Sequence, residues 1–160
     1  CLAFAQIAEA TKNKNYEEIA KTTFERILAR IDNQKGHWNK ASSKARKMKA
    51  FDLPMILCNV SLEIENLIGK EKVKEKIDKC LHEILDVVYK PELGFIVEHV
   101  NEDGSLADNF EGRLLNPGHP PEATWFIMDL GVRLNKPEYI EKAVEISLKE
   151  IKKGWDSKYD

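Results

Sequence analysis

Apolar residues recur along most of the chain at the three- and four-residue spacing of an α-helix. Six segments follow this pattern: residues 2–10, 16–31, 50–68, 71–88, 121–134 and 137–153. The first, third and fifth segments are dense in apolar residues on nearly every side, whereas the others carry a single apolar stripe. A helix that is apolar all round is buried, and a helix with one stripe turns its other side to water. The chain is therefore predicted to be all-α.

This alternation predicts three helical hairpins that stack with their first helices inside and their second helices outside. Such stacking is typical of α-solenoids and α/α toroids. We expect the hairpins to form one domain over residues 1–160, and the last helix to end with Gly154 in the C-cap position. The chain begins at Cys1 and not at a methionine, and residues 155–160 show no pattern typical of the end of a domain. We therefore expect it to be a piece of a longer protein.

The links between the predicted helices differ in length. Links within a hairpin are short, such as residues 135–136, whereas those between hairpins are long and cover residues 32–49 and 89–120. Long loops often carry function, and both belong to the face that holds the N-termini of the inner helices. Residues 94–100 alternate between apolar and polar, and residues 101–104 read Asn-Glu-Asp-Gly. This pattern predicts a strand and the turn of a small β-hairpin.

Composition narrows the class of protein without defining its function. The 25 Lys and Arg against 27 Asp and Glu leave a net charge of −2, which argues against a protein that binds nucleic acid by neutralising phosphates. No apolar run approaches the roughly 18 residues of a membrane span. Three scattered cysteines without a CxxC pair predict reduced thiols and a cytoplasmic location. HExxH, Walker and GxGxxG motifs are absent from the sequence, so neither a metal nor a nucleotide site is predicted.

The least typical stretch of the chain is residues 112–125, in which two prolines follow His119. Proline suits the first position of a helix, so we expect His119 at a helix entrance and Glu122 in the first turn. The positive end of the helix dipole disfavours an imidazolium there and leaves a neutral ring that can act as a base. Glu122 can share the face of His119 and orient its ring or bind a hydroxyl. By spacing alone, a helix-capping turn with a structural histidine is an equal alternative.

One stretch of eleven residues reads Asn116-Pro117-Gly118-His119-x-x-Glu122-Ala123-x-Trp125-Phe126. It resembles the signature of the N-acylglucosamine 2-epimerase family, also known as renin-binding protein. Residues 97–104, 112–113, 53–57 and 154–156 look like the same family. The resemblance covers about residues 40–160, and the first forty residues match in pattern only.

The resemblance implies an (α/α)6 barrel of six helical hairpins, so three hairpins would be half of the ring. It implies a sugar 2-epimerase that interconverts N-acylglucosamine and N-acylmannosamine by removing the C2 proton and returning one to the other face. His119 matches one of two catalytic histidines, and the second lies outside this sequence. The expected partner is a small-molecule sugar, and we also consider a homodimer. No cofactor is expected, although some family members are modulated by ATP, which is not consumed.

This chemistry needs a base near neutral pH and a group that holds the charge of the enolate. Arg113 is the nearest fixed cation and is the candidate for charge stabilisation, with a surface arginine as an equal alternative. Asn116 is expected to cap the turn rather than bind a hydroxyl. Glu98 is expected to line the cavity and contribute to substrate binding.

Aromatic residues can stack on a sugar ring. Trp38 is the strongest candidate for this role because a large aromatic residue in a polar loop needs a reason. Trp125 and Phe126 are expected to be core residues of the helix over 121–134 instead.

Other functions remain open. A cellobiose 2-epimerase or mannose isomerase on the same barrel tends to carry an Asn and a His where this chain has Leu53-Pro54-Met55. That difference favours the N-acylglucosamine branch. A non-catalytic helical-repeat scaffold would not need a histidine at the entrance of an inner helix. A glycoside hydrolase would need a carboxylate pair, and the sequence offers no clear one.

Overall fold

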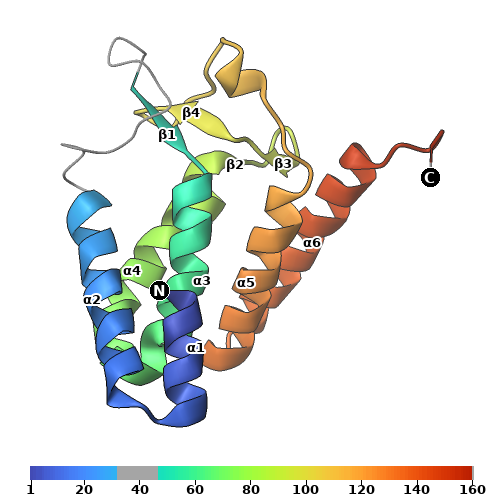
Figure 1. Cartoon of the computed structure of the whole chain (residues 1–160). Helices are drawn as coiled ribbons and strands as arrows, with labels where there is room; N and C mark the ends of the chain where they lie inside the picture. Colours follow the sequence, from blue (N-terminus) through green and yellow to red (C-terminus); the bar gives the residue numbers. More distant parts are fainter. Residues whose placement is uncertain (32–46, 160) are drawn as a thin grey trace. The chain divides into compact units, whose positions relative to one another are not determined.

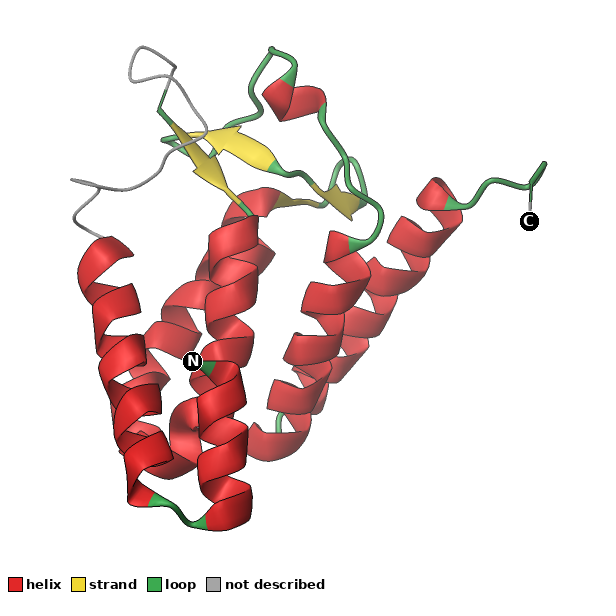
Figure 2. Cartoon of the chain, in the orientation of Figure 1, coloured by secondary structure: helices red, strands yellow, loops and turns green. Residues whose placement is uncertain are grey.

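The computed structural model of the chain describes residues 1–31 and 47–159, in which helices dominate (Figures 1 and 2). The helices of this part are α1 (Leu2–Thr11), α2 (Lys14–Ile31), α3 (Asp52–Ile68), α4 (Lys70–His82), α5 (His119–Leu134) and α6 (Pro137–Gly154). Each begins close to where the hydrophobic pattern places a helix. The predicted all-α class with three successive helical hairpins is confirmed. No helix of the described residues combines the length and hydrophobicity needed to cross a bilayer.

The chain divides into two compact units. One consists of residues 1–46 and 60–76, and the other of residues 47–59 and 77–160. The first unit contains α1 and α2, whereas α5, α6 and the strands belong to the second. The single domain over residues 1–160 stays a prediction.

Tight turns join the two helices of each hairpin, as the short links predicted. Lys12 and Asn135 take the left-handed conformation at φ 55° and 54°, and Gly69 does so at φ 94°. A residue in this conformation commonly ends a helix because its N–H can reach back to a free carbonyl. The Lys12 N–H accordingly donates to the Ala8 carbonyl, 2.8 Å away.

The hairpin of α5 and α6 forms much of the core of the second unit. Buried apolar side chains from both helices meet there: Phe126, Ile127, Leu130, Ala143 and Ile146. A Cβ at Gly131 would lie 2.6 Å from Cγ1 of Ile140, so glycine lets the helices pack closely. This packing fixes the N-terminal end of α5, where the candidate site lies.

The predicted helix over 71–88 has a different last turn. The α-helical part ends at His82, and a π-helical segment, η1 (Glu83–Val88), continues into β2 (Tyr89–Lys90). β2 pairs antiparallel with β3 (Phe95–Ile96) around Gly94, whose φ of 77° favours glycine. α6 therefore lies beside a two-stranded ribbon, because α6 and β3 are in contact.

The single strand predicted over 94–100 is divided in two. β3 ends at Ile96, and a second strand, β4 (His99–Asn101), pairs with β1 (Met48–Ala50). The predicted turn after it is confirmed, since the Gly104 N–H donates to the Asn101 carbonyl at 2.9 Å. The described end of the first long link thus pairs with the second, so the two links meet as expected.

The two cysteines of the second unit are buried, as predicted. Burial raises the pKa of the Cys58 thiol to about 12, and nearby Cys80 raises it further. A thiol with so high a pKa stays protonated near neutral pH and is a poor nucleophile. Both cysteines therefore serve as small apolar core residues.

Candidate active site

His119 is the first residue of α5, at the helix entrance that the prolines predicted. Pro120 and Pro121 follow it in the first turn, where a fixed φ is favourable and a missing N–H leaves no hydrogen bond unmade. The His119 side chain is 34% exposed, so its ring can be reached from solvent. The local sequence thus fixes the backbone of a histidine while leaving its ring accessible.

The Nδ1 atom of His119 faces the carboxylate of Glu98. It lies 3.1 Å from Oε1 and 3.2 Å from Oε2. Glu98 follows β3 and is only 7% exposed, and its carbonyl accepts a hydrogen bond from the Phe51 N–H at 2.9 Å. An ionised carboxylate can only accept hydrogen bonds. The geometry therefore assigns the ring proton to Nδ1.

The other ring nitrogen, Nε2, contacts the side-chain amide of Asn116 at 3.0 Å. The Asn116 Oδ1 accepts a hydrogen bond from the Gly118 N–H at 3.2 Å, which directs the amide nitrogen toward the ring. The Asn116 Nδ2 then donates to Nε2. Both hydrogen bonds of the ring agree on the same tautomer, with the proton on Nδ1 and the Nε2 lone pair accepting from Asn116.

A histidine held in this way is suited to proton transfer. Its Nε2 can take a proton, and the buried carboxylate at Nδ1 stabilises the positive charge that the ring then gains. The described residues contain no cluster of three or more His, Cys, Asp or Glu side chains that could hold a metal ion. The carboxylate at Nδ1 and the amide at Nε2 give His119 the geometry that general-base catalysis requires.

The orienting role predicted for Glu122 stays a prediction. Both ring nitrogens of His119 are engaged by Glu98 and Asn116, while the Glu122 side chain is exposed in the first turn of α5. Its other predicted role, binding a hydroxyl, stays a prediction. Glu98 is buried against the ring of His119, and its predicted part in substrate binding stays a prediction.

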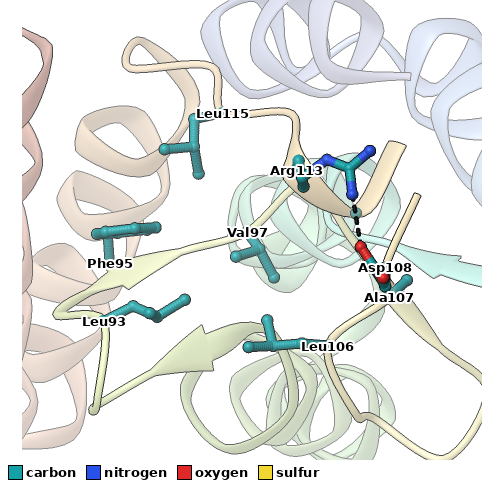
Figure 3. Close-up of a pocket in the computed structure, with 9 residues that line it drawn as sticks. Leu93, Phe95, Val97, Leu106, Ala107, Asp108, Arg113 and Leu115 are labelled. Carbon is teal, nitrogen blue, oxygen red and sulfur yellow. Dashed lines mark hydrogen bonds and ion pairs between the residues drawn. The ribbon is translucent and has the colours of Figure 1, made fainter. Parts of the chain in front are cut away.

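Arg113 lines a pocket of about 360 Å³ (Figure 3). Its Nη1 forms an ion pair with Oδ1 of Asp108 at 2.5 Å, and both side chains are exposed. Figure 3 shows Phe95, Val97 and Leu106 directed toward a common space, with the ion pair to one side of it. The residues that line this pocket do not include His119. Charge stabilisation by Arg113 stays a prediction.

The remaining candidates have different outcomes. Trp38 lies outside the described residues. Phe126 is buried as predicted, but Trp125 is 62% exposed, so its assignment to the core is wrong for this chain. Neighbouring helical residues point about 100° apart, which turns one ring inward and the other outward. Asn116 is not the N-cap of α5, since Gly118 holds that position, although its side chain stabilises the turn before the helix.

Two solved structures share the fold. A D-mannose isomerase superimposes with a TM-score of 0.66 at 16% identity, covering 98% of this chain and 44% of its own. A sugar epimerase from a ruminal bacterium also gives a TM-score of 0.66, at 18% identity, covering 92% of this chain and 40% of its own. These two likenesses show that the chain has the fold of an α/α toroid.

The sequence matches the N-acylglucosamine 2-epimerase (GlcNAc 2-epimerase) family over residues 1–160, and the chain belongs to that family. It is 25% identical over 162 residues to the N-acylglucosamine 2-epimerase of Rattus norvegicus and 27% identical over 161 residues to that of Homo sapiens. These alignments cover 99% and 97% of this chain, but only 38% and 37% of the two relatives. The predicted family is confirmed and extends over the first forty residues as well.

Proposed function

We propose that this chain supplies one proton-transfer group of a sugar 2-epimerase that interconverts N-acylglucosamine and N-acylmannosamine. The observation that carries the proposal is His119, whose Nδ1 faces buried Glu98 and whose Nε2 is held as an acceptor. The names of the rat and human relatives support the choice of substrate. His119 is thus the proposed base of the reaction.

The proposed reaction is an exchange of protons at C2 of the open-chain sugar. Nε2 of His119 takes the C2 proton, the electrons of the C–H bond form a C1–C2 double bond, and the aldehyde oxygen becomes an enolate. A proton returned to the opposite face of C2 restores the aldehyde with C2 inverted. No oxidant or reductant is needed, so no cofactor is consumed; ATP as an effector is a separate proposal.

A related isomerase is the second candidate, favoured by the structural likeness to a D-mannose isomerase. On a sugar that carries a hydroxyl at C2, removal of the C2 proton gives a 1,2-enediolate, which becomes a 2-ketose when O2 loses its proton and C1 gains one. His119 would play the same part in both reactions, so its geometry does not separate them. The products do: an epimerase yields the C2 epimer and an isomerase yields the ketose.

Cellular location and assembly belong to the same proposal. The buried thiols of Cys58 and Cys80 support a reducing, cytoplasmic compartment. We propose that any self-association involves the apolar side chains that α5 and α6 leave exposed, such as Val132 and Leu148.

The test is deuterium wash-in from D2O at C2 of N-acetylglucosamine and N-acetylmannosamine, followed by NMR on the full-length gene product. His119→Asn is expected to lower kcat for exchange by about 10²- to 10⁴-fold, with little change in KM. His82→Asn, on an exposed histidine of α4, is the matched control. A His119→Asn variant that exchanges at the wild-type rate would remove His119 from the reaction.

A further inference from the structure

Glu150 is a buried carboxylate that the proposed proton transfer does not use. It lies near the end of α6 and is only 3% exposed. Its Oε1 accepts a hydrogen bond from the backbone N–H of Ile96, 2.5 Å away. A buried charged group is costly unless it is hydrogen-bonded, so a carboxylate in this place calls for a reason.

The peptide that Glu150 holds leads directly to Glu98. Ile96 is the last residue of β3, and only Val97 separates it from Glu98. The Val97 N–H donates to the Val88 carbonyl at 3.1 Å, and the Glu98 carbonyl accepts from Phe51. Ile96, Val97 and Glu98 are thus each held by a backbone hydrogen bond. Glu150 accepts the first of these bonds, from Ile96.

The raised pKa of Glu150 is compatible with this role. Burial raises the pKa of Glu150, and the nearby Glu98 carboxylate raises it further against the opposing Ile96 hydrogen bond. A raised pKa favours the neutral carboxyl, whose carbonyl oxygen still accepts the Ile96 N–H. Beside Glu150 on α6, Lys149 pairs with Glu145 at 2.6 Å. Glu98 is the carboxylate that contacts Nδ1 of His119.

The same face of α6 also supports the second partner of His119. Gly154 lies four residues after Glu150, one helical turn further along. A Cβ at Gly154 would lie only 2.4 Å from Cβ of Pro117, the residue that follows Asn116. Thus one side of α6 contacts both chain segments from which the hydrogen bonds of the His119 ring arise.

We propose that Glu150 is a positioning residue, which holds Glu98 against Nδ1 of His119 through the Ile96 N–H and so keeps Nε2 unprotonated, as the nitrogen that can accept a proton. The inference rests on the proposed function for its catalytic meaning. The tautomer of the ring is a property of the protein itself and can be measured without any reaction.

The test compares Glu150→Leu, which keeps most of the volume and removes the acceptor, with Glu150→Gln, which keeps an oxygen acceptor. Imidazole ¹⁵N shifts of the histidine-labelled full-length gene product report which ring nitrogen is protonated, and the His119 signals are assigned with His119→Asn. Wild type and Glu150→Gln should show one neutral tautomer, protonated at Nδ1. Glu150→Leu should show a mixture and lose about 10- to 100-fold in kcat, with KM little changed.

A double-mutant cycle with Glu98→Gln separates positioning from general stability. If Glu150 acts through Glu98, adding Glu150→Leu to Glu98→Gln should lower kcat little further. Additive losses, or a Glu150→Leu variant that keeps a single Nδ1–H tautomer and wild-type kcat, would overturn the inference. Should Glu150→Leu fail to fold, Glu150→Asp, which withdraws the carboxylate by one methylene, carries the same expectations.

Failure of the inference and failure of the proposed function are distinguishable. If wild type shows no exchange at C2 but the tautomer still changes in Glu150→Leu, the epimerase proposal fails and the positioning role stands. If exchange occurs and the tautomer does not respond to Glu150, the positioning role fails alone.

Discussion

Nδ1 of His119 lies within 3.2 Å of both carboxylate oxygens of Glu98, although the two residues are 21 positions apart in the sequence. A carboxylate that faces one ring nitrogen fixes which nitrogen is left to act as a base. The relationship makes Glu98, and not only the histidine, a determinant of the proposed reaction.

Replacing Glu98 by Gln should therefore impair exchange at C2. The variant keeps the size of the side chain but loses the charge that stabilises a protonated ring, so kcat should fall by about 10²- to 10⁴-fold with KM little changed. Deuterium wash-in measures the effect. Glu102→Gln, at an exposed position in the following turn, should behave as wild type. Equal rates for wild type and Glu98→Gln would show that the carboxylate does not assist His119.

Asn116→Asp should reverse the hydrogen bond at Nε2. An aspartate in place of the amide presents an acceptor to Nε2, which favours a proton on the nitrogen that must be free to act as the base. We expect kcat to fall by about tenfold or more. Asn116→Ser, which can still accept from the Gly118 N–H but places no charge at the ring, should be less affected. A wild-type ¹⁵N signature in Asn116→Asp would contradict this assignment of the amide.

The raised pKa of Glu150 predicts how stability depends on pH. Because the folded state holds this proton more tightly than the unfolded state, the contribution of Glu150 is complete below the unfolded carboxyl value near 4.5. It is lost as pH rises through the raised folded value. Glu150→Gln cannot ionise, so its Tm should rise relative to wild type as pH increases above that range. Thermal melts of both proteins across this range measure the difference; a Tm gap that stays constant with pH would contradict it.

The exposed apolar side chains of α5 and α6 should promote self-association when the 160 residues are expressed alone. Val132 and Leu148 are 70% and 63% exposed, and Trp125, Val144 and Trp155 are exposed as well. Apolar surface of this kind favours association or aggregation. Sedimentation should show species larger than a monomer, and Val132→Lys with Leu148→Lys should reduce them. A monodisperse monomer at all concentrations would contradict the prediction.

Periodicity predicted the helices well because each one buries a regular stripe of side chains. The two prolines after His119 predicted its place at a helix entrance for a similar, local reason. The Glu98 partner was not predictable in this way, since residues 99–118 between it and His119 have no helical period that would fix their relative positions. The alternation over 94–100 likewise could not show that Val97 and Glu98 separate two strands with different partners.

Gly154 illustrates a different limit. Glycine near the end of a helix is typical of a left-handed C-cap, and the sequence predicted one. In the structure Gly154 is the last residue of the helix, with Trp155 in the cap position. Its lack of a side chain instead allows Pro117 to approach, and this reason becomes visible only once distant segments are in contact.

The side-chain amide of Asn116 occupies the hydrogen-bonding position at Nε2 of His119. Before any sugar arrives, the lone pair of Nε2 already holds an amide hydrogen. A C–H group is a poor hydrogen-bond donor and cannot displace an amide by itself. In the proposed reaction, the free energy for this displacement must come from the rest of the sugar, including its hydroxyl and acyl groups. A short aldehyde with the same acidic C–H would leave the Asn116 amide hydrogen-bonded to Nε2. In the proposed reaction, His119 therefore becomes available as a base only to a molecule large enough to make these further contacts.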